Sequence, residues 1–225
     1  MFALFFIPVV FATSWFYPMD QIDKRQTVKG FGQYVDNNFY KGKESLFPYN
    51  RFYGFHTGVD LEALPSEQKD EIKVPVFAVS NGTIAYIGNL QGYGGVILEK
   101  LGSENLTALY GHVKTDTNYK TGDHVNARET LTYLGNGFSS ETSLERKHLH
   151  FGIYKGSDLY FHGHEQTLEQ LNQRWIDPIK FLKEKGAVSP ITEKSPTPVK
   201  EVSKTKSLWE SFWDFILSVL RGFHF

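Results

Sequence analysis

Histidine and carboxylate side chains gather in three short stretches whose residue types suit metal binding and hydrolysis. In the first stretch, FHTGVD (residues 55–60), His56 precedes Asp60 by four positions. In a straight strand these side chains share a face but lie about 13 Å apart, at about 3.3 Å per residue. Because metal–ligand distances are about 2 Å, one ion can hold both only if the chain bends, and Gly58 tolerates unusual backbone angles. Taken alone, the pair is more typical of a surface loop.

The second stretch, HLHFGIY (residues 148–154), has the alternation of a β-strand. His148 and His150 share one face, while the apolar residues between and after them point into a core. The two Cα atoms lie about 6.6 Å apart along a strand, so one imidazole can bind a metal while the other meets a water or substrate beside it. The alternative is an exposed strand face on which histidine is tolerated.

The third stretch, LYGHV (residues 109–113), places His112 at the end of a predicted strand. By itself this histidine is expected to be structural. The interpretation changes when the three stretches are considered together, because a His-x-Gly-x-Asp, a Tyr-x-His and a His-x-His motif rarely occur in one chain by chance.

Composition restricts what such residues can do. The chain has 225 residues, which is enough for one sizeable domain. Its composition, with 40% hydrophobic and 22% charged residues, excludes a disordered chain. With no cysteine, a metal site needs histidine and carboxylate ligands, and a thiol nucleophile is excluded. The net charge of −1 supplies no attraction for a nucleic acid, which is therefore not an expected partner.

The elements that must position these residues are mainly short strands separated by turn residues, which predicts an antiparallel β-sheet fold. Asn81-Gly82 is a hairpin signal between two of these strands. Helices are predicted only late, over residues 167–175 and 178–184. The predicted strands cover residues 73–79, 83–87, 96–98, 106–113 and 147–154.

From about Lys24 to Lys185 the sequence resembles the lysostaphin-type, or LytM-type, zinc metallopeptidases, which cut peptide bonds in bacterial peptidoglycan. The family's fold, a core of antiparallel sheet with an open groove, agrees with the strand pattern. Besides the three histidine motifs, the resemblance includes Phe31-Gly32, VPVFAVSNG (74–82), GYG (92–94), KTGDHV (120–125) and Asp177-Pro178.

The resemblance implies that His56, Asp60 and His150 are the Zn²⁺ ligands and that His112 and His148 are catalytic, flanking the activated water. Three protein ligands leave a coordination position open, and zinc can lower the pKa of a water there from 15.7 to about 7. A neutral imidazole can orient or deprotonate the water, and a protonated one can stabilise the oxyanion. The implied function is a zinc-dependent endopeptidase acting on peptidoglycan crosslinks.

Two other interpretations remain open at this stage. One is a catalytically silent relative that binds the wall or regulates another wall hydrolase, and the other is a metal-free β domain with incidental histidines. Relatives that lose activity usually lose ligands, whereas the implied set is complete here, which favours the enzyme. The segment 21–51, or the C-terminal tail, can still cover the groove.

The chain departs from the resemblance before His148, where it has SLERK (residues 143–147) and the family commonly has small residues and a glycine or proline. Arg146 and Lys147 are expected either to solvate a loop, the favoured interpretation, or to contact acidic substrate groups. Residues 155–174 are expected to form part of the groove wall, and their His162 and His164 are not expected to bind metal. Tyr93 and Tyr110 either donate hydrogen bonds in the groove or, as is more common on sheets, provide packing.

The two ends of the chain are predicted to lie outside the catalytic domain, 24–185. Residues 1–18 resemble an export signal or membrane segment, with an uncleaved anchor, a buried strand or a mis-assigned start as alternatives. Residues 186–206 have the composition of a linker. Residues 207–225 form an amphipathic pattern that predicts an interfacial or partner-docking helix, with packing on the domain or a short span as alternatives.

The expected partners are therefore a peptidoglycan peptide and, through residues 207–225, a membrane surface or a protein. Because peptidoglycan lies outside the cytoplasmic membrane, the expected localisation is exported: periplasmic, cell-envelope or extracellular, with membrane association through the tail as a further expectation.

Overall fold

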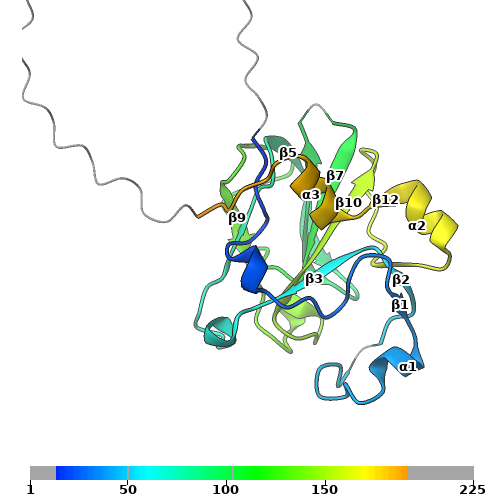
Figure 1. The fold of residues 1–225 in the computed structure, drawn as a ribbon. Coiled ribbons are helices and arrows are strands. Elements are labelled where there is room, and N and C mark those ends of the chain that lie inside the picture. The colour runs from blue at the N-terminus through cyan, green and yellow to red at the C-terminus, as the bar shows by residue number, and fades with distance from the viewer. Residues whose placement is uncertain (1–13, 50, 103, 192–225) are drawn as a thin grey trace, which may run out of the picture. The chain divides into compact units, whose positions relative to one another are not determined.

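A central sheet of antiparallel strands dominates the computed structural model, which describes residues 14–49, 51–102 and 104–191. The strand order is β12-β10-β7-β6-β5-β8, and β3 pairs with β10 beside this path. Figure 1 shows β3, in cyan, running next to β10. The predicted mainly antiparallel β fold is confirmed. The strands are β3 (Gly58–Glu62), β5 (Gly82–Leu90), β6 (Gly94–Leu101), β7 (Leu106–Gly111), β8 (His124–Val125), β10 (His148–Lys155) and β12 (Trp175–Ile176).

Two smaller sheets flank the central one. The order β1-β2-β11 makes a three-stranded sheet, and β4 pairs with β9. The chain passes from β2 to β3 through Thr57 alone, so two neighbouring strands in sequence belong to different sheets. The strands are β1 (Tyr34–Val35), β2 (Gly54–His56), β4 (Pro75–Phe77), β9 (Thr130–Tyr133) and β11 (His164–Glu165).

Asn81-Gly82 does not form the predicted hairpin, because β4, which precedes it, pairs with β9 instead of β5. The tight hairpin lies one strand later, between β5 and β6. There Gly92 and Gly94 have φ of 89° and 70°, a left-handed conformation that glycine adopts without steric cost. The local turn signal was therefore correct for a turn and wrong for the pairing.

Both helices predicted near the C-terminus are confirmed, as α2 (Leu168–Arg174) and α3 (Pro178–Glu184). Asp177 caps α3 by accepting hydrogen bonds from the backbone N–H groups of Ile179 and Lys180. The expectation that helix occurs only late is wrong, because α1 (Asn37–Tyr40) forms early, next to β1 and β2 in Figure 1. Short 3₁₀ turns also occur at Ile22–Lys24, Pro65–Glu67 and Ser140–Thr142.

The core lies on both faces of β10. Leu149, Phe151 and Ile153 point into the main apolar cluster, as the alternation predicts. On the opposite face, Tyr154 and Trp175 belong to a second cluster, and every residue of β10 except the last is buried. The histidine-bearing face is therefore enclosed, and the alternative of an exposed strand face is wrong.

The described parts of the two predicted end segments pack on the sheet. Trp15 is buried against Phe181, with ring centroids 5.2 Å apart, and Phe16 forms a parallel bridge with Val188. The chain divides into the units Met1–Pro190 and Ile191–Phe225. Residues 1–13 of the predicted signal, most of the linker and the whole predicted C-terminal helix lie outside the described residues. Within the described part, none of the helices has the length and apolar character needed to cross a membrane.

Candidate metal centre and active site

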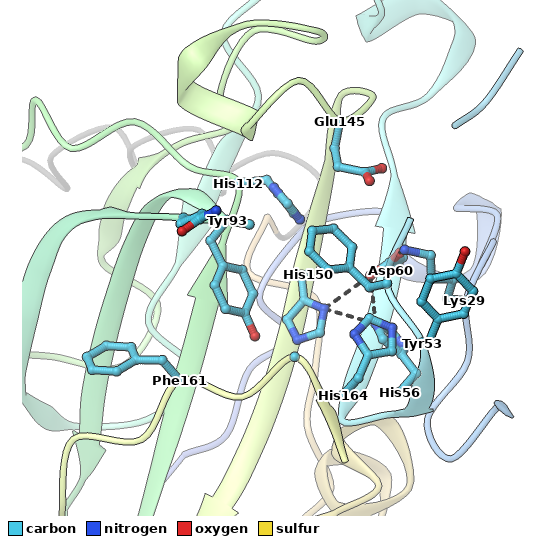
Figure 2. Close-up of a pocket in the computed structure, with 14 residues that line it drawn as sticks. Lys29, Tyr53, His56, Asp60, Tyr93, His112, Glu145, His150, Phe161 and His164 are labelled. Atoms are coloured by element: carbon cyan, nitrogen blue, oxygen red, sulfur yellow. Dashed lines mark hydrogen bonds and ion pairs between the residues drawn. The ribbon is translucent and has the colours of Figure 1, made fainter. Parts of the chain in front are cut away.

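Three side chains converge on one point: His56 at the end of β2, Asp60 on β3 and His150 on β10. His56 Nε2 lies 3.0 Å from His150 Nδ1 and 3.1 Å from Asp60 Oδ1, and His150 Nδ1 lies 3.2 Å from the same oxygen. Dashed lines join these atoms in Figure 2. Among the described residues, this is the one group of three histidine or acidic side chains close enough to share an ion. The group consists of His56, Asp60 and His150, the residues that the sequence resemblance implies as ligands, and it is called the ligand triangle below.

The chemistry of this donor set fits a tetrahedral cation. Ligand atoms about 2.0–2.1 Å from a tetrahedral zinc lie about 3.3 Å from one another, close to the separations found here. His56 Nδ1 lies 3.1 Å from the carbonyl oxygen of Gly30, which can only accept, so this nitrogen carries the proton. His56 Nε2 therefore carries a lone pair, and this lone pair faces the Asp60 carboxylate oxygen. Two such acceptors repel each other unless they share a cation.

Strand pairing brings the ligands together. Asp60 on β3 lies directly opposite His150 on β10. His56 is the last residue of β2, the strand just before β3, so it lies next to the same pair. Gly58 lies in β3 and is not among the glycines with a positive φ, so its predicted role in allowing unusual backbone angles is wrong. It is needed for a close approach instead, because a Cβ there would lie 2.5 Å from the carbonyl oxygen of Phe151.

Two further histidines, also expected from the sequence, lie next to the three ligands. The rings of His112 and His148 have centroids 4.3 Å apart. His112 Nδ1 lies 3.1 Å from the carbonyl oxygen of Thr142, and His148 Nδ1 lies 2.8 Å from that of Arg146. Because carbonyls only accept, each Nδ1 donates and each Nε2 is left as an acceptor.

Burial keeps both of these imidazoles neutral. It lowers the pKa of His112 to about 3, against the opposing effect of the Asp60 charge. It also lowers the pKa of His148 well below its usual value, and the charge of Arg146 acts in the same direction. The pKa of His150 falls to about 4, again mainly through burial. Neutral imidazole is the form that binds metals and accepts protons.

Polar and charged groups surround Asp60. Burial alone would raise the pKa of this carboxyl, but the surrounding imidazoles and Lys29 outweigh the effect of burial, so the pKa is held well below its usual range. Asp60 Oδ2 lies 2.9 Å from Arg146 Nη2 and 3.7 Å from Lys29 Nζ. The carboxylate is thus ionised, as a metal ligand must be.

Arg146 and Lys147 are buried, with 4% and 2% of their surfaces exposed. Both sequence interpretations of these residues are therefore wrong, because neither solvates a loop and neither is available to a substrate. Arg146 forms ion pairs with Asp60, Glu62 and Glu145. Lys147 Nζ donates to the backbone carbonyls of Lys69 and Ile72.

The three ligand side chains open into a cavity of about 280 Å³ (Figure 2). Phe161, Gly163 and His164 contribute to its lining, which agrees with the expectation that residues 155–174 form a groove wall. Tyr93 also lines it and packs against the rings of His112 and His150. Five further lining residues carry no local signal for a site in the sequence: Lys29, Phe52, Tyr53, Gln91 and Glu145.

His162, His164 and Tyr110 do not belong to the ligand triangle. His162 is exposed, and His164 packs its ring 5.1 Å from that of His56 without joining the triangle. Tyr110 is buried in the core and donates a hydrogen bond to Glu99, so it packs in the sheet and does not face the groove.

Comparison with solved structures supports the fold. The antimicrobial peptidase lysostaphin from Staphylococcus simulans matches with a TM-score of 0.50 at 23% identity, covering 84% of this chain and 60% of that chain. Its catalytic domain matches at 25% identity with a TM-score of 0.49, covering 72% of this chain and 95% of that chain. This chain thus spans 60% of the length of the longer lysostaphin structure. A comparison with curated proteins finds no match.

The match to a family model defines the chain as a metallopeptidase domain of the lysostaphin type. The family model described as peptidase family M23 matches residues 54–166. This range includes the five site residues described above: His56, Asp60, His112, His148 and His150. The chain belongs to peptidase family M23.

Proposed function

We propose that the protein is a zinc-dependent endopeptidase that hydrolyses peptide bonds in bacterial peptidoglycan crosslinks. The observation that carries this proposal is the ligand triangle of 3.0 to 3.2 Å with two neutral histidines beside it. Membership of family M23 and the likeness to lysostaphin support the reaction class.

In this proposal His56 Nε2, Asp60 Oδ1 and His150 Nδ1 would hold the zinc ion. Zinc held there would supply a Lewis acid for the scissile carbonyl and would lower the pKa of a water at the site to about 7. The low pKa of His150 keeps its nitrogen available as a ligand below neutral pH. Burial of all three side chains holds them in place, because each is at most 3% exposed.

His112 and His148 are the groups that accept the proton of the attacking water and pass it to the leaving amine. Each presents an unprotonated Nε2 while its Nδ1–H donates to a backbone carbonyl, which fixes the orientation of the ring. One Nε2 can accept a proton from the attacking water, and the proton then passes to the nitrogen of the leaving amine. After taking the proton, the imidazolium can stabilise the negative charge that develops on the carbonyl oxygen.

The alternative of a catalytically silent wall-binding or regulatory relative is less well supported. Such a protein does not need the two neutral imidazoles next to a complete ligand set, both of which this chain has. The cavity at the ligands also gives a substrate somewhere to bind. The proposed substrate is a peptidoglycan peptide, and the proposed location is therefore outside the cytoplasmic membrane, in the periplasm, cell envelope or medium.

The experiment is digestion of purified cell walls of known crosslink type by the purified protein. We expect about one zinc per chain, release of new amino groups, loss of release on chelation and recovery when zinc is added back. Mass spectrometry of the released fragments identifies the bond. Zinc-loaded protein that cleaves no wall type, although it binds walls, would favour the silent relative.

A further inference from the structure

We infer that Arg146 is a positioning residue that holds Asp60 as a one-oxygen metal ligand. This inference rests on the metal site of the proposed function and goes beyond it by assigning a role to a residue that touches neither substrate nor metal. It concerns the segment just before β10, where the chain departs most clearly from the sequence pattern it resembles.

The two carboxylate oxygens of Asp60 have different surroundings. Oδ1 faces the ligand nitrogens, at 3.1 Å from His56 and 3.2 Å from His150. Oδ2 faces two cations, at 2.9 Å from Arg146 Nη2 and 3.7 Å from Lys29 Nζ, and it lies 3.5 Å from His148 Nε2. Figure 2 shows Lys29 next to Asp60. A carboxylate whose second oxygen is hydrogen-bonded in this way offers a metal only its first oxygen.

Arg146 is itself held rigidly. Its Nε lies 2.9 and 3.0 Å from the two oxygens of Glu62, and its Nη2 lies 2.8 Å from the first of them. Its Nη1 lies 3.2 Å from Glu145. The planar guanidinium has its donors in a fixed fork, so anchoring one edge on Glu62 aims Nη2 at Asp60.

A small aromatic core covers the arginine. The Phe47 ring centroid lies 4.8 Å from the guanidinium carbon of Arg146 and 4.9 Å from Lys29 Nζ. Phe47 packs with Val35, Phe39 and Tyr40 of the β1–α1 region. Because this core excludes water, the hydrogen bond from Arg146 to Asp60 is stronger than it would be on the surface.

The backbone of the same residue orients a second site group, since the Arg146 carbonyl accepts the proton of His148 Nδ1. Replacing the side chain leaves this carbonyl in place. The effect of the guanidinium on Asp60 can therefore be tested apart from the orientation of His148.

The test compares Arg146→Met and Arg146→Lys with Arg25→Met in the full-length protein. Arg25 is a matched control because it is also buried, 6% exposed, and is ion-paired with Asp20 and Glu67. It reaches Glu62 only at the backbone carbonyl, 3.2 Å from Arg25 Nη1, and has no ion pair with Asp60. Two properties are measured for each: the Zn²⁺ dissociation constant, by competition with a chelator, and the visible absorption spectrum of the Co²⁺ form. The spectrum reports coordination number independently of hydrolysis.

We expect Arg146→Met to bind Zn²⁺ about 10 to 100 times more weakly, the usual effect of losing a group that orients a ligand. Its Co²⁺ absorption should weaken, because a carboxylate free to bind through both oxygens raises the coordination number. Arg146→Lys should be intermediate, since an ammonium keeps the charge but lacks the fork. Arg25→Met should match the unmodified protein in both measurements, whatever its thermal stability.

Unchanged or tighter Zn²⁺ binding by Arg146→Met, with an unchanged Co²⁺ spectrum, would overturn the inference and leave the proposed function intact. Equal losses in Arg146→Met and Arg25→Met would also overturn it, because a general loss of packing would then explain the result. If Arg146→Met does not fold, Arg146→Lys decides, and wild-type affinity in that variant is the contrary result. Unmodified protein that binds no Zn²⁺ at His56 and His150 defeats both proposals.

Discussion

The ring nitrogens His56 Nε2 and His150 Nδ1 lie 3.0 Å apart, although 94 positions separate the two residues in the chain. Strand pairing in the central sheet brings the two residues together. β3 begins two residues after His56 and pairs with β10, and this pairing places Asp60 directly opposite His150. One ion can therefore bind side chains that lie 94 positions apart in the chain.

His56→Ala should abolish zinc binding, whereas His164→Ala should leave it intact. The two residues lie directly opposite each other on β2 and β11, with ring centroids 5.1 Å apart, but only His56 has a nitrogen in the ligand triangle. We expect the metal content to fall from about one ion per chain to nearly none in His56→Ala alone. Metal analysis after gel filtration measures this, and equal losses in both variants would contradict the ligand assignment.

His112→Ala and His148→Ala should each retain zinc and lose turnover by roughly 10² to 10⁴, the usual contribution of a general acid or base. The reason is that both imidazoles adjoin the ligands without belonging to the triangle. Wall hydrolysis and metal content are measured on the same preparation. Full turnover in both variants would show that another group moves the proton.

Gly58→Ala should destabilise the protein by about 1–3 kcal/mol or more, the usual cost of overpacking a core. Its Cβ would lie 2.5 Å from the carbonyl oxygen of Phe151 and 2.8 Å from His150 Nε2, so β3 and β10 must separate. Gly30→Ala is the matched control, because nothing lies within 4 Å of a Cβ there. Urea unfolding of both metal-free variants tests this, and similar midpoints would contradict it.

Glu99→Gln should change how stability depends on pH. Burial raises the pKa of Glu99 to about 8, against an ordinary value of 4.5, despite the hydrogen bond from Tyr110. Between these values the folded protein keeps the proton and the unfolded chain has lost it. Stability therefore falls as pH rises from 4.5 to 8, and is level outside this window.

The Glu99 contribution amounts to about 1.4 kcal/mol per pH unit, on the order of 5 kcal/mol across the window. Unfolding of the metal-free protein in urea at pH 5, 6.5 and 8 measures it. The unmodified protein should lose more stability than Glu99→Gln over this range. Parallel pH profiles for the two proteins would show that this carboxyl is ionised in the fold at pH 5.

Much of the site could be predicted from local patterns. The alternation in residues 148–154 correctly predicted that Leu149, Phe151 and Ile153 lie in the core and that His148 and His150 share the other face of the strand. The ligand triangle contains the three residues that the motif resemblance implied. These features depend on spacing along one strand or on short motifs, which the sequence displays directly.

Other features depend on which distant segments meet. Arg146 is adjacent in sequence to a loop, and nothing local shows that Glu62 and Phe47 come to cover it. The misassigned hairpin at Asn81-Gly82 has the same origin, since β4 pairs with a strand more than fifty residues away.

The amino-acid sequence by itself determined the chemistry available to this protein: histidine and carboxylate donors, no thiols, and strands that alternate between polar and apolar residues. Only the tertiary structure decided that Gly58 serves close packing, that Arg146 is enclosed with Asp60, and that both faces of β10 are buried. The physical reason is that burial and charge pairing arise from contacts between remote segments, whereas periodicity and residue type are local properties of the chain.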